Sequence, residues 1–140
     1  MDLETALEWA GNRRLATLAT IRADGRPQTS DIVYGLIDGQ FLITVAPNRA
    51  KTANLRRDGR SVLHLSQETP PSYLSFDGFT EVHGPATSID DPVVDRMVAY
   101  FEAAKGEPHS DWDEYRQAMV DEERILLAFI PSSVTGWARD

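Results

Sequence analysis

The chain contains 140 residues with a formal net charge of −8 and 41% hydrophobic residues, which predicts one soluble globular domain over residues 1–140. The absence of cysteine excludes disulfides, thiolate metal sites and a thiol nucleophile, and the acidic balance argues against nucleic-acid binding, which requires an extended basic surface. No apolar run approaches the roughly 20 residues of a membrane span and the N-terminus does not resemble a signal peptide, so we expect a cytoplasmic protein without membrane contact.

The first third of the chain predicts a short helix followed by a β meander. Leu3 and Leu7 have helical spacing, and Asp2 is a candidate N-cap. Residues 14–47 then predict three β-segments, because two turn signals, ADGR and DG, divide this stretch. Apolar side chains occur at both odd and even positions of residues 15–21, so we expect this strand to be buried on both faces.

A basic segment follows the meander at residues 48–60. Its 13 residues hold five of the 14 basic side chains and a single acid, Asp58, although the chain as a whole is acidic. The segment opens a predicted short helix, and backbone N–H groups at a helix start suit a phosphate group when Arg and Lys lie beside them. We interpret the segment as a binding site for a phosphorylated cofactor.

The second half of the chain predicts further strands. We expect one strand at residues 60–66 and a long or paired strand at residues 73–89, broken near residues 77–78 where Asp and Gly occur together. Two more strand-like runs close the chain at residues 124–133 and 134–139. Six or seven strands with few helices predict a mostly β protein, a small β-barrel with peripheral helices.

Two helices interrupt these strands. The first is predicted at residues 92–106, with Asp91 before it and Pro92 at its first turn. The second is predicted to start at Ser110, with Asp113 three residues later in the position of a capping box.

The order of these motifs resembles a known protein family. The motifs are LATLAT, DGRPQTSDIVY, FLITVAPNRAKTANLRRD and a terminal VTGW. In this order they resemble the split β-barrel, FMN-binding proteins related to pyridoxamine 5′-phosphate oxidase, over nearly the whole chain. Within that family the chain is most similar to the actinobacterial branch described as probable coenzyme F420-dependent enzymes, of which the segment at residues 109–120 is characteristic.

The resemblance implies a homodimer with the cofactor ring at its interface and the phosphate on the basic motif. Gln28, Thr29 and Ser30 would flank the ring and the ribityl-type chain from one strand, and Thr44, Val45 and Ala46 from the next. The implied phosphate motif comprises Asn48, Arg49, Ala50, Lys51 and Thr52, and Trp137 of the partner subunit would approach the cofactor.

Two positions depart from the vitamin B6 oxidases of the family. Ser30 stands where those enzymes carry an arginine, and Gly35 where they carry a lysine. These departures argue against vitamin B6 oxidation and against tight FMN binding. Deazaflavin F420 has a phosphate followed by lactate and glutamates, so it requires more positive charge than FMN, and Arg56 and Arg57, with Arg60 beyond them, match such a tail.

We therefore expect an F420-dependent oxidoreductase that transfers a hydride to a small organic acceptor without a catalytic acid or base from the protein. An FMN-dependent oxidoreductase, or a non-catalytic deazaflavin- or tetrapyrrole-binding protein, is the alternative. Simpler interpretations also stay open: Arg56 and Arg57 as solvated charges, and Trp137 as a hydrophobic dimer contact. The three histidines lack ligand spacing, so we expect no metal site.

Overall fold

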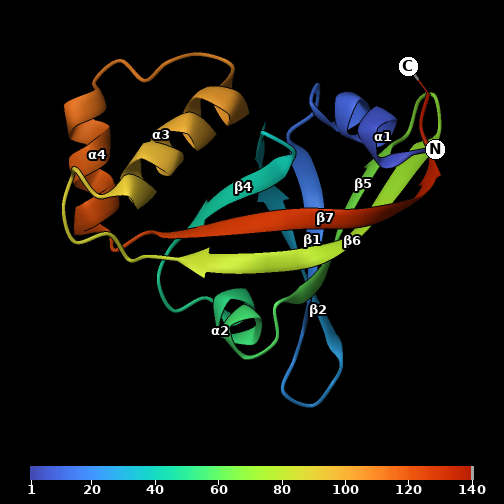
Figure 1. The fold of residues 1–140 in the computed structure, drawn as a ribbon, viewed down its shortest axis with the longest axis horizontal. Coiled ribbons are helices and arrows are strands. Elements are labelled where there is room, and N and C mark those ends of the chain that lie inside the picture. The colour runs from blue at the N-terminus through green and yellow to red at the C-terminus, as the bar shows by residue number, and fades with distance from the viewer. Residues whose placement is uncertain (140) are drawn as a thin grey trace.

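The computed structural model describes residues 1–139, which form seven strands and four helices (Figure 1). In chain order these elements are α1 (Leu3–Ala10), β1 (Leu15–Ile21), β2 (Pro27–Val33), β3 (Gly35–Ile37), β4 (Gln40–Val45), α2 (Ala50–Arg57), β5 (Arg60–Gln67), β6 (Ser72–His83), α3 (Pro92–Lys105), α4 (Trp112–Asp121) and β7 (Ile125–Trp137). The predicted mostly β architecture is confirmed.

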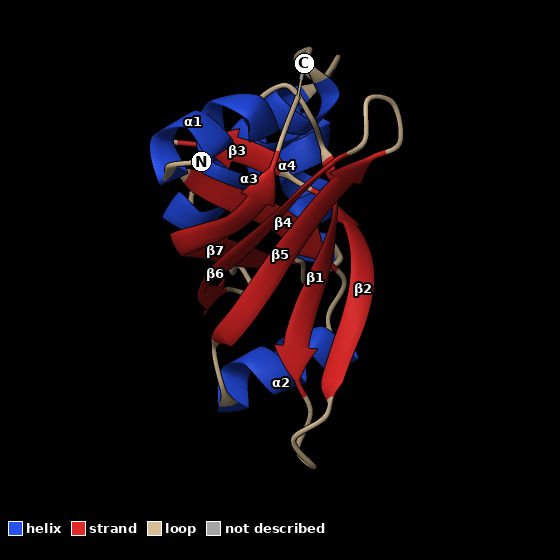
Figure 2. Ribbon diagram, turned by 90° about the vertical axis from the view of Figure 1, so that its right-hand side faces the viewer, coloured by secondary structure: helices blue, strands red, loops and turns tan. Residues whose placement is uncertain are grey.

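The two edges of the sheet are consecutive in the chain. The seven strands form one antiparallel sheet in the order β2-β1-β5-β6-β7-β4-β3. β2 and β3 therefore stand at opposite edges, although Tyr34 alone separates them. The sheet has to curl to bring these edges together, and the result is a split β-barrel (Figure 2).

Tyr34 explains why residues 14–47 form four strands rather than the predicted three. Its buried ring lies 4.9 Å from that of Phe41, and its hydroxyl donates to the backbone oxygen of Ala10 at 2.7 Å. This inward turn ends β2 and starts β3. Gly35 then allows α3 to approach, because a Cβ there would lie 2.9 Å from the backbone oxygen of Tyr100.

Two hydrophobic clusters meet at β7. The first cluster fills the barrel beneath α1. It includes Phe41, whose ring centroid lies 5.2 Å from that of Phe76 and 5.9 Å from that of Phe129. The second lies between the sheet and α3 and α4, and it includes Met97 and Leu126. The first five residues of β7 are all buried, so this part of β7 is covered on both faces.

The prediction that β1 is buried on both faces was wrong. Its burial alternates along the strand, with Leu18 fully buried and Leu15 69% exposed. One face of β1 points into the barrel, and the other belongs to the open outer face of the sheet. Periodicity failed here because Leu and Ile occupy positions on this open face.

The longest strands differ from their predicted boundaries. β6 continues through the expected break with a change of register between Asp77 and Gly78, and the glycine is required because a Cβ there would collide with the backbone oxygen of Ile130. β6 ends at His83, earlier than predicted. The two predicted C-terminal strands form the single strand β7, which pairs with β6 along its length.

The helix starts follow the expected capping chemistry with one shift. Asp2 accepts a hydrogen bond from the backbone N–H of Thr5 at 2.8 Å, and Asp91 caps α3 ahead of Pro92. The cap of α4 is Asp111 rather than the predicted Ser110. α1 and α2 lie at opposite ends of the barrel (Figures 1 and 2). Over residues 1–139 no helix is both long and apolar enough to span a membrane.

Candidate cofactor-binding site

The basic segment begins with an uncapped helix. β4 ends at Val45, the chain turns through Asn48 in the left-handed region (φ 66°), and α2 starts at Ala50. The N-cap of α2 is Arg49, whose side chain makes no capping hydrogen bond. The first N–H groups of α2 are therefore available to a ligand, and the positive end of the helix dipole favours an anion there.

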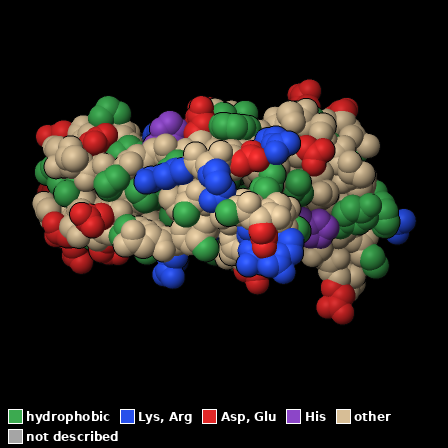
Figure 3. Space-filling model, turned by 90° about the horizontal axis from the view of Figure 1, so that it is seen from below, with side chains coloured by type: hydrophobic (Ala, Val, Ile, Leu, Met, Phe, Trp, Pro, Cys, Tyr) green, Lys and Arg blue, Asp and Glu red, His purple; other side chains and the backbone are tan. Residues whose placement is uncertain are grey.

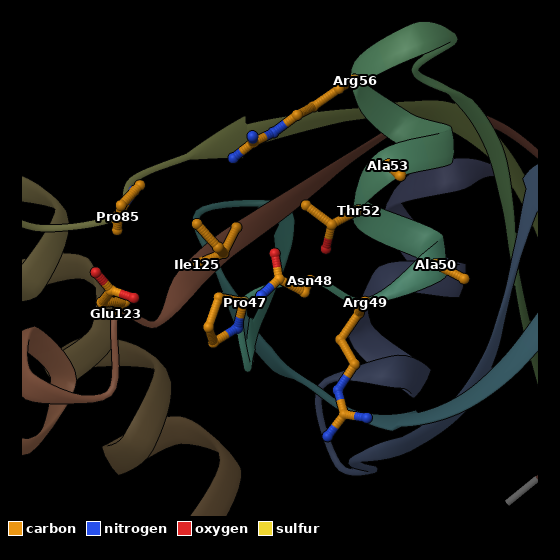
Figure 4. Close-up of a pocket in the computed structure, with 10 residues that line it drawn as sticks. All are labelled: Pro47, Asn48, Arg49, Ala50, Thr52, Ala53, Arg56, Pro85, Glu123 and Ile125. Carbon is orange, nitrogen blue, oxygen red and sulfur yellow. The ribbon is translucent and has the colours of Figure 1, made fainter.

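The first cleft lies between α2 and the start of β7 and has a volume of about 640 Å³. In Figure 4, Arg56 extends across its rim toward Pro85, and Glu123 stands on the opposite wall. Its lining residues are Pro47, Asn48, Arg49, Ala50, Thr52, Ala53, Arg56, Pro85, Glu123 and Ile125.

The second cleft lies on the other side of the start of α2 and has a volume of about 320 Å³. Arg49 lines both clefts, so the start of α2 separates them. Viewed from this end of the barrel, several Lys and Arg side chains gather across the middle of the molecule (Figure 3). The lining residues of the second cleft are Asp31, Ile32, Val33, Ile43, Thr44, Val45, Ala46, Arg49, Lys51, Tyr100 and Arg124.

The side chains at the start of α2 fit a phosphate group. Thr52 is 5% exposed, and its Oγ1 has no hydrogen-bond partner within residues 1–139. Burial lowers the pKa of Lys51, and the neighbouring charge of Arg49 lowers it further. Two crowded cations, an unpartnered hydroxyl and free helix N–H groups would all gain from a bound oxyanion.

The predicted residues of β2 do not line either cleft. Gln28 instead joins a polar cluster behind α2: its Oε1 accepts from Thr20 Oγ1 and from Asn54 Nδ2, both at 3.3 Å. Its Nε2 donates to Ser30 Oγ at 3.2 Å, and Thr29 points to the exposed face of the strand. This cluster holds α2 against β1 and β2.

The three arginines beyond the phosphate motif point in different directions. Arg56 lines the first cleft. Arg57 ties α2 to β1, because its Nη2 donates to the backbone oxygen of Ile21 at 3.1 Å and to Asn54 Oδ1 at 2.9 Å. Arg60 pairs with Asp58 at 2.7 Å and lowers the pKa of that carboxyl to about 2.

Trp137 lies far from α2 within one chain. It ends β7 near α1, at the opposite end of the barrel (Figure 1). Its side chain is 52% exposed, and its ring centroid is 4.7 Å from that of Tyr73. A contact between Trp137 and a cofactor at α2 therefore requires a second subunit.

Four polar residues of the two clefts were missed from the sequence. Asp31, Tyr100, Glu123 and Arg124 come from β2, α3 and the connection between α4 and β7. They reach the site through tertiary packing, which local patterns do not report. The adjacent charges of Glu123 and Arg124, directly before an apolar strand, were the one available signal.

Comparisons with known proteins agree with this fold. A family model described as pyridoxamine 5′-phosphate oxidase matches residues 3–138. The conserved hypothetical protein Rv2991 from Mycobacterium tuberculosis is 23% identical, with a TM-score of 0.78 over 98% of this chain and 84% of that one.

Two further solved structures share the fold at lower identity. An F420 reductase is 18% identical with a TM-score of 0.58, over 87% of this chain and 89% of that one. The heme storage protein HutZ from Vibrio cholerae is 17% identical with a TM-score of 0.69, over 96% of this chain and 94% of that one. Because the family model spans almost the whole chain, the chain belongs to the pyridoxamine 5′-phosphate oxidase-like split-barrel family.

Proposed function

We propose that the protein is an F420-dependent oxidoreductase in which the reduced deazaflavin, when bound, supplies a hydride to a small organic acceptor. The observation that carries this proposal is the pair of clefts that meet at the uncapped start of α2. Two clefts that meet at one anion-binding helix start suit a ligand whose phosphate lies between a ring system and an extended tail.

Each part of the cofactor has matching residues. The phosphate would bind Arg49, Lys51, Thr52 and the first N–H groups of α2. The ring would lie in the second cleft against residues 44–46, and its volume of about 320 Å³ lies within the range of ligand pockets, roughly 300–1,000 Å³. The acidic tail would follow the first cleft toward Arg56.

A second copy of the chain would complete the site. The outer face of the sheet carries Leu15 and Trp137, which are 69% and 52% exposed. His64 and Tyr73 stack on the same face with ring centroids 5.8 Å apart. Large apolar and aromatic side chains on an open sheet face favour a homodimer, and this dimer would bring Trp137 of the partner subunit to the cofactor.

The protein residues position the cofactor and exclude water rather than exchange protons with it. Burial raises the pKa of Tyr100, so its hydroxyl keeps its proton at neutral pH, and it donates to the backbone oxygen of Val33 at 3.2 Å. We assign no general acid or base to the lining residues, and the acceptor would take its proton from solvent or from its own groups.

FMN is the second candidate cofactor. Arg57 and Arg60 are both engaged with neighbouring protein groups, which leaves Arg56 as the arginine of these three that faces the first cleft. Such a site has less positive charge for a polyanionic tail than the sequence pattern predicts, and FMN requires only the ring and phosphate positions.

A titration of the purified protein with F420 and with FMN, followed by intrinsic tryptophan fluorescence, separates the two candidates. We expect micromolar or tighter binding of F420, on the order of −8 kcal/mol, and weaker binding of FMN. Tighter binding of FMN would assign the chain to the flavin-dependent members of the family. Binding of neither cofactor would overturn the proposed function.

A further inference from the structure

The second cleft contains an arginine that belongs to none of the cofactor motifs. Arg124 directly precedes β7 and lines this cleft together with Thr44. Its Nη2 donates to the backbone oxygen and to Oγ1 of Thr44, both at 3.2 Å. Its Nε is buried without an acceptor within residues 1–139, and no carboxylate of those residues forms an ion pair with it.

The other charges that line the second cleft do not compensate Arg124. Asp31 is the one carboxylate among the described residues that line the cleft, and it accepts a hydrogen bond from Thr17 Oγ1 at 3.0 Å. Arg49 and Lys51 add two further cations to the same lining. A partly buried guanidinium with few acceptors is unfavourable, so this cleft favours a ligand that brings anionic or carbonyl oxygen atoms.

The size and polarity of the cleft limit what that ligand is. Its volume of about 320 Å³ accommodates one planar ring system and little more. Arg124 and Tyr100 supply polar groups to the cleft, whereas Ile43 and Val45 line it from β4 with their side chains buried in the barrel cluster. A flat heterocycle with an oxygen-bearing edge matches this lining.

We propose that Arg124 binds the carbonyl edge of the cofactor's pyrimidinedione ring and favours the reduced form over the oxidised form. This inference rests on the proposed function, because it requires the ring to occupy the second cleft. The pyrimidinedione ring is common to F420 and FMN, and it carries more negative charge when reduced. A guanidinium fixed beside that edge stabilises the additional charge.

The test measures the affinity of oxidised and reduced FMN and F420, under anaerobic conditions, for the wild type and three variants. Arg124→Gln removes the charge, Arg124→Lys keeps it without the planar guanidinium, and Arg96→Gln is the matched control. Arg96 is a half-buried arginine of α3 that donates to Gln40 Oε1 at 3.0 Å and does not line the second cleft.

We expect Arg124→Gln to weaken binding of both reduced cofactors roughly ten- to hundredfold and to weaken binding of both oxidised forms less. The reduction potential of bound FMN should fall in parallel. Arg124→Lys should recover part of the preference for the reduced form, and Arg96→Gln should behave as the wild type does.

Several results would overturn the inference. Equal losses for oxidised and reduced cofactor, or wild-type affinities in a folded Arg124→Gln variant, would show that Arg124 does not contact the ring. If Arg124→Gln does not fold, the affinities of the wild type for the oxidised and reduced cofactor test the inference instead. Equal affinities for the two redox forms would contradict it. Wild-type binding with an unchanged redox preference in the variants would leave the proposed function standing, whereas a wild type that binds neither cofactor would overturn both.

Discussion

Lys51 is half-buried beside a second cation at the start of α2, and this crowding makes it a sensitive reporter of a bound anion. We expect Lys51→Ala to weaken binding of F420 and of FMN by the same amount, about 1.5–3 kcal/mol for a lost charged hydrogen bond. Calorimetric titration measures both losses. Lys105→Ala is the matched control, because Lys105 is the other lysine of the chain and lies exposed at the end of α3. Unchanged affinity in Lys51→Ala would contradict the proposed binding of the phosphate at the start of α2.

Arg56 and Arg57 are neighbours with different surroundings, so their alanine variants should differ in kind. Arg56→Ala should weaken binding of F420 more than binding of FMN, because Arg56 lines the first cleft. It should leave the unfolding temperature unchanged. Arg57→Ala should instead lower the free energy of unfolding by about 1 kcal/mol, because it loses hydrogen bonds to Ile21 and Asn54. Parallel cofactor titrations and urea unfolding separate the two effects. Equal losses of F420 and FMN in Arg56→Ala would argue against a tail in the first cleft.

At the scale of elements, the end of α4 holds a side chain where glycine is usual. Glu123 adopts a left-handed conformation (φ 52°), and the next N–H, that of Arg124, returns to the backbone oxygen of Met119 at 3.0 Å. A non-glycine residue is unfavourable there, so Glu123→Gly should raise the free energy of unfolding by roughly 0.5–1 kcal/mol. Glu122→Gly, at φ −83°, should lower it. A stability loss in Glu123→Gly would mean that the Glu123 side chain contributes more than its backbone costs.

The elements also show how far the sequence could predict this molecule. The helix at residues 3–10, the turns and the basic start of α2 follow from local chemistry such as the Asp2 cap, and each was predicted. The division at Tyr34 and the pairing of β7 could not be predicted, because both depend on what fills the barrel. The same limit applies to the site. Residues 48–52 and Arg56 lie within nine consecutive residues, whereas Tyr100 and Arg124 reach the second cleft only after α3 and β7 have packed.

At the scale of the whole molecule, the proposed dimer depends on the outer face of the sheet. Trp137→Asp places a charge on this face, so we expect the variant to be monomeric at concentrations where the wild type is dimeric. Light scattering after size exclusion measures the mass of each species. Ile89→Asp is a suitable control, because Ile89 is also partly exposed but lies outside the sheet. A monomeric wild type, or a dimeric Trp137→Asp, would contradict the interface and with it the role of Trp137 at the cofactor.

The position of β7 has a consequence for biosynthesis. β7 lies between β6 and β4, and it carries side chains into both hydrophobic clusters. The ribosome makes it after the other strands and helices of residues 1–139, so a nascent chain that lacks β7 exposes two unpaired strand edges and two open clusters at once. Folding must therefore wait until translation of β7 is complete, and a premature stop codon before Ile125 would produce an aggregation-prone fragment rather than a shorter folded protein.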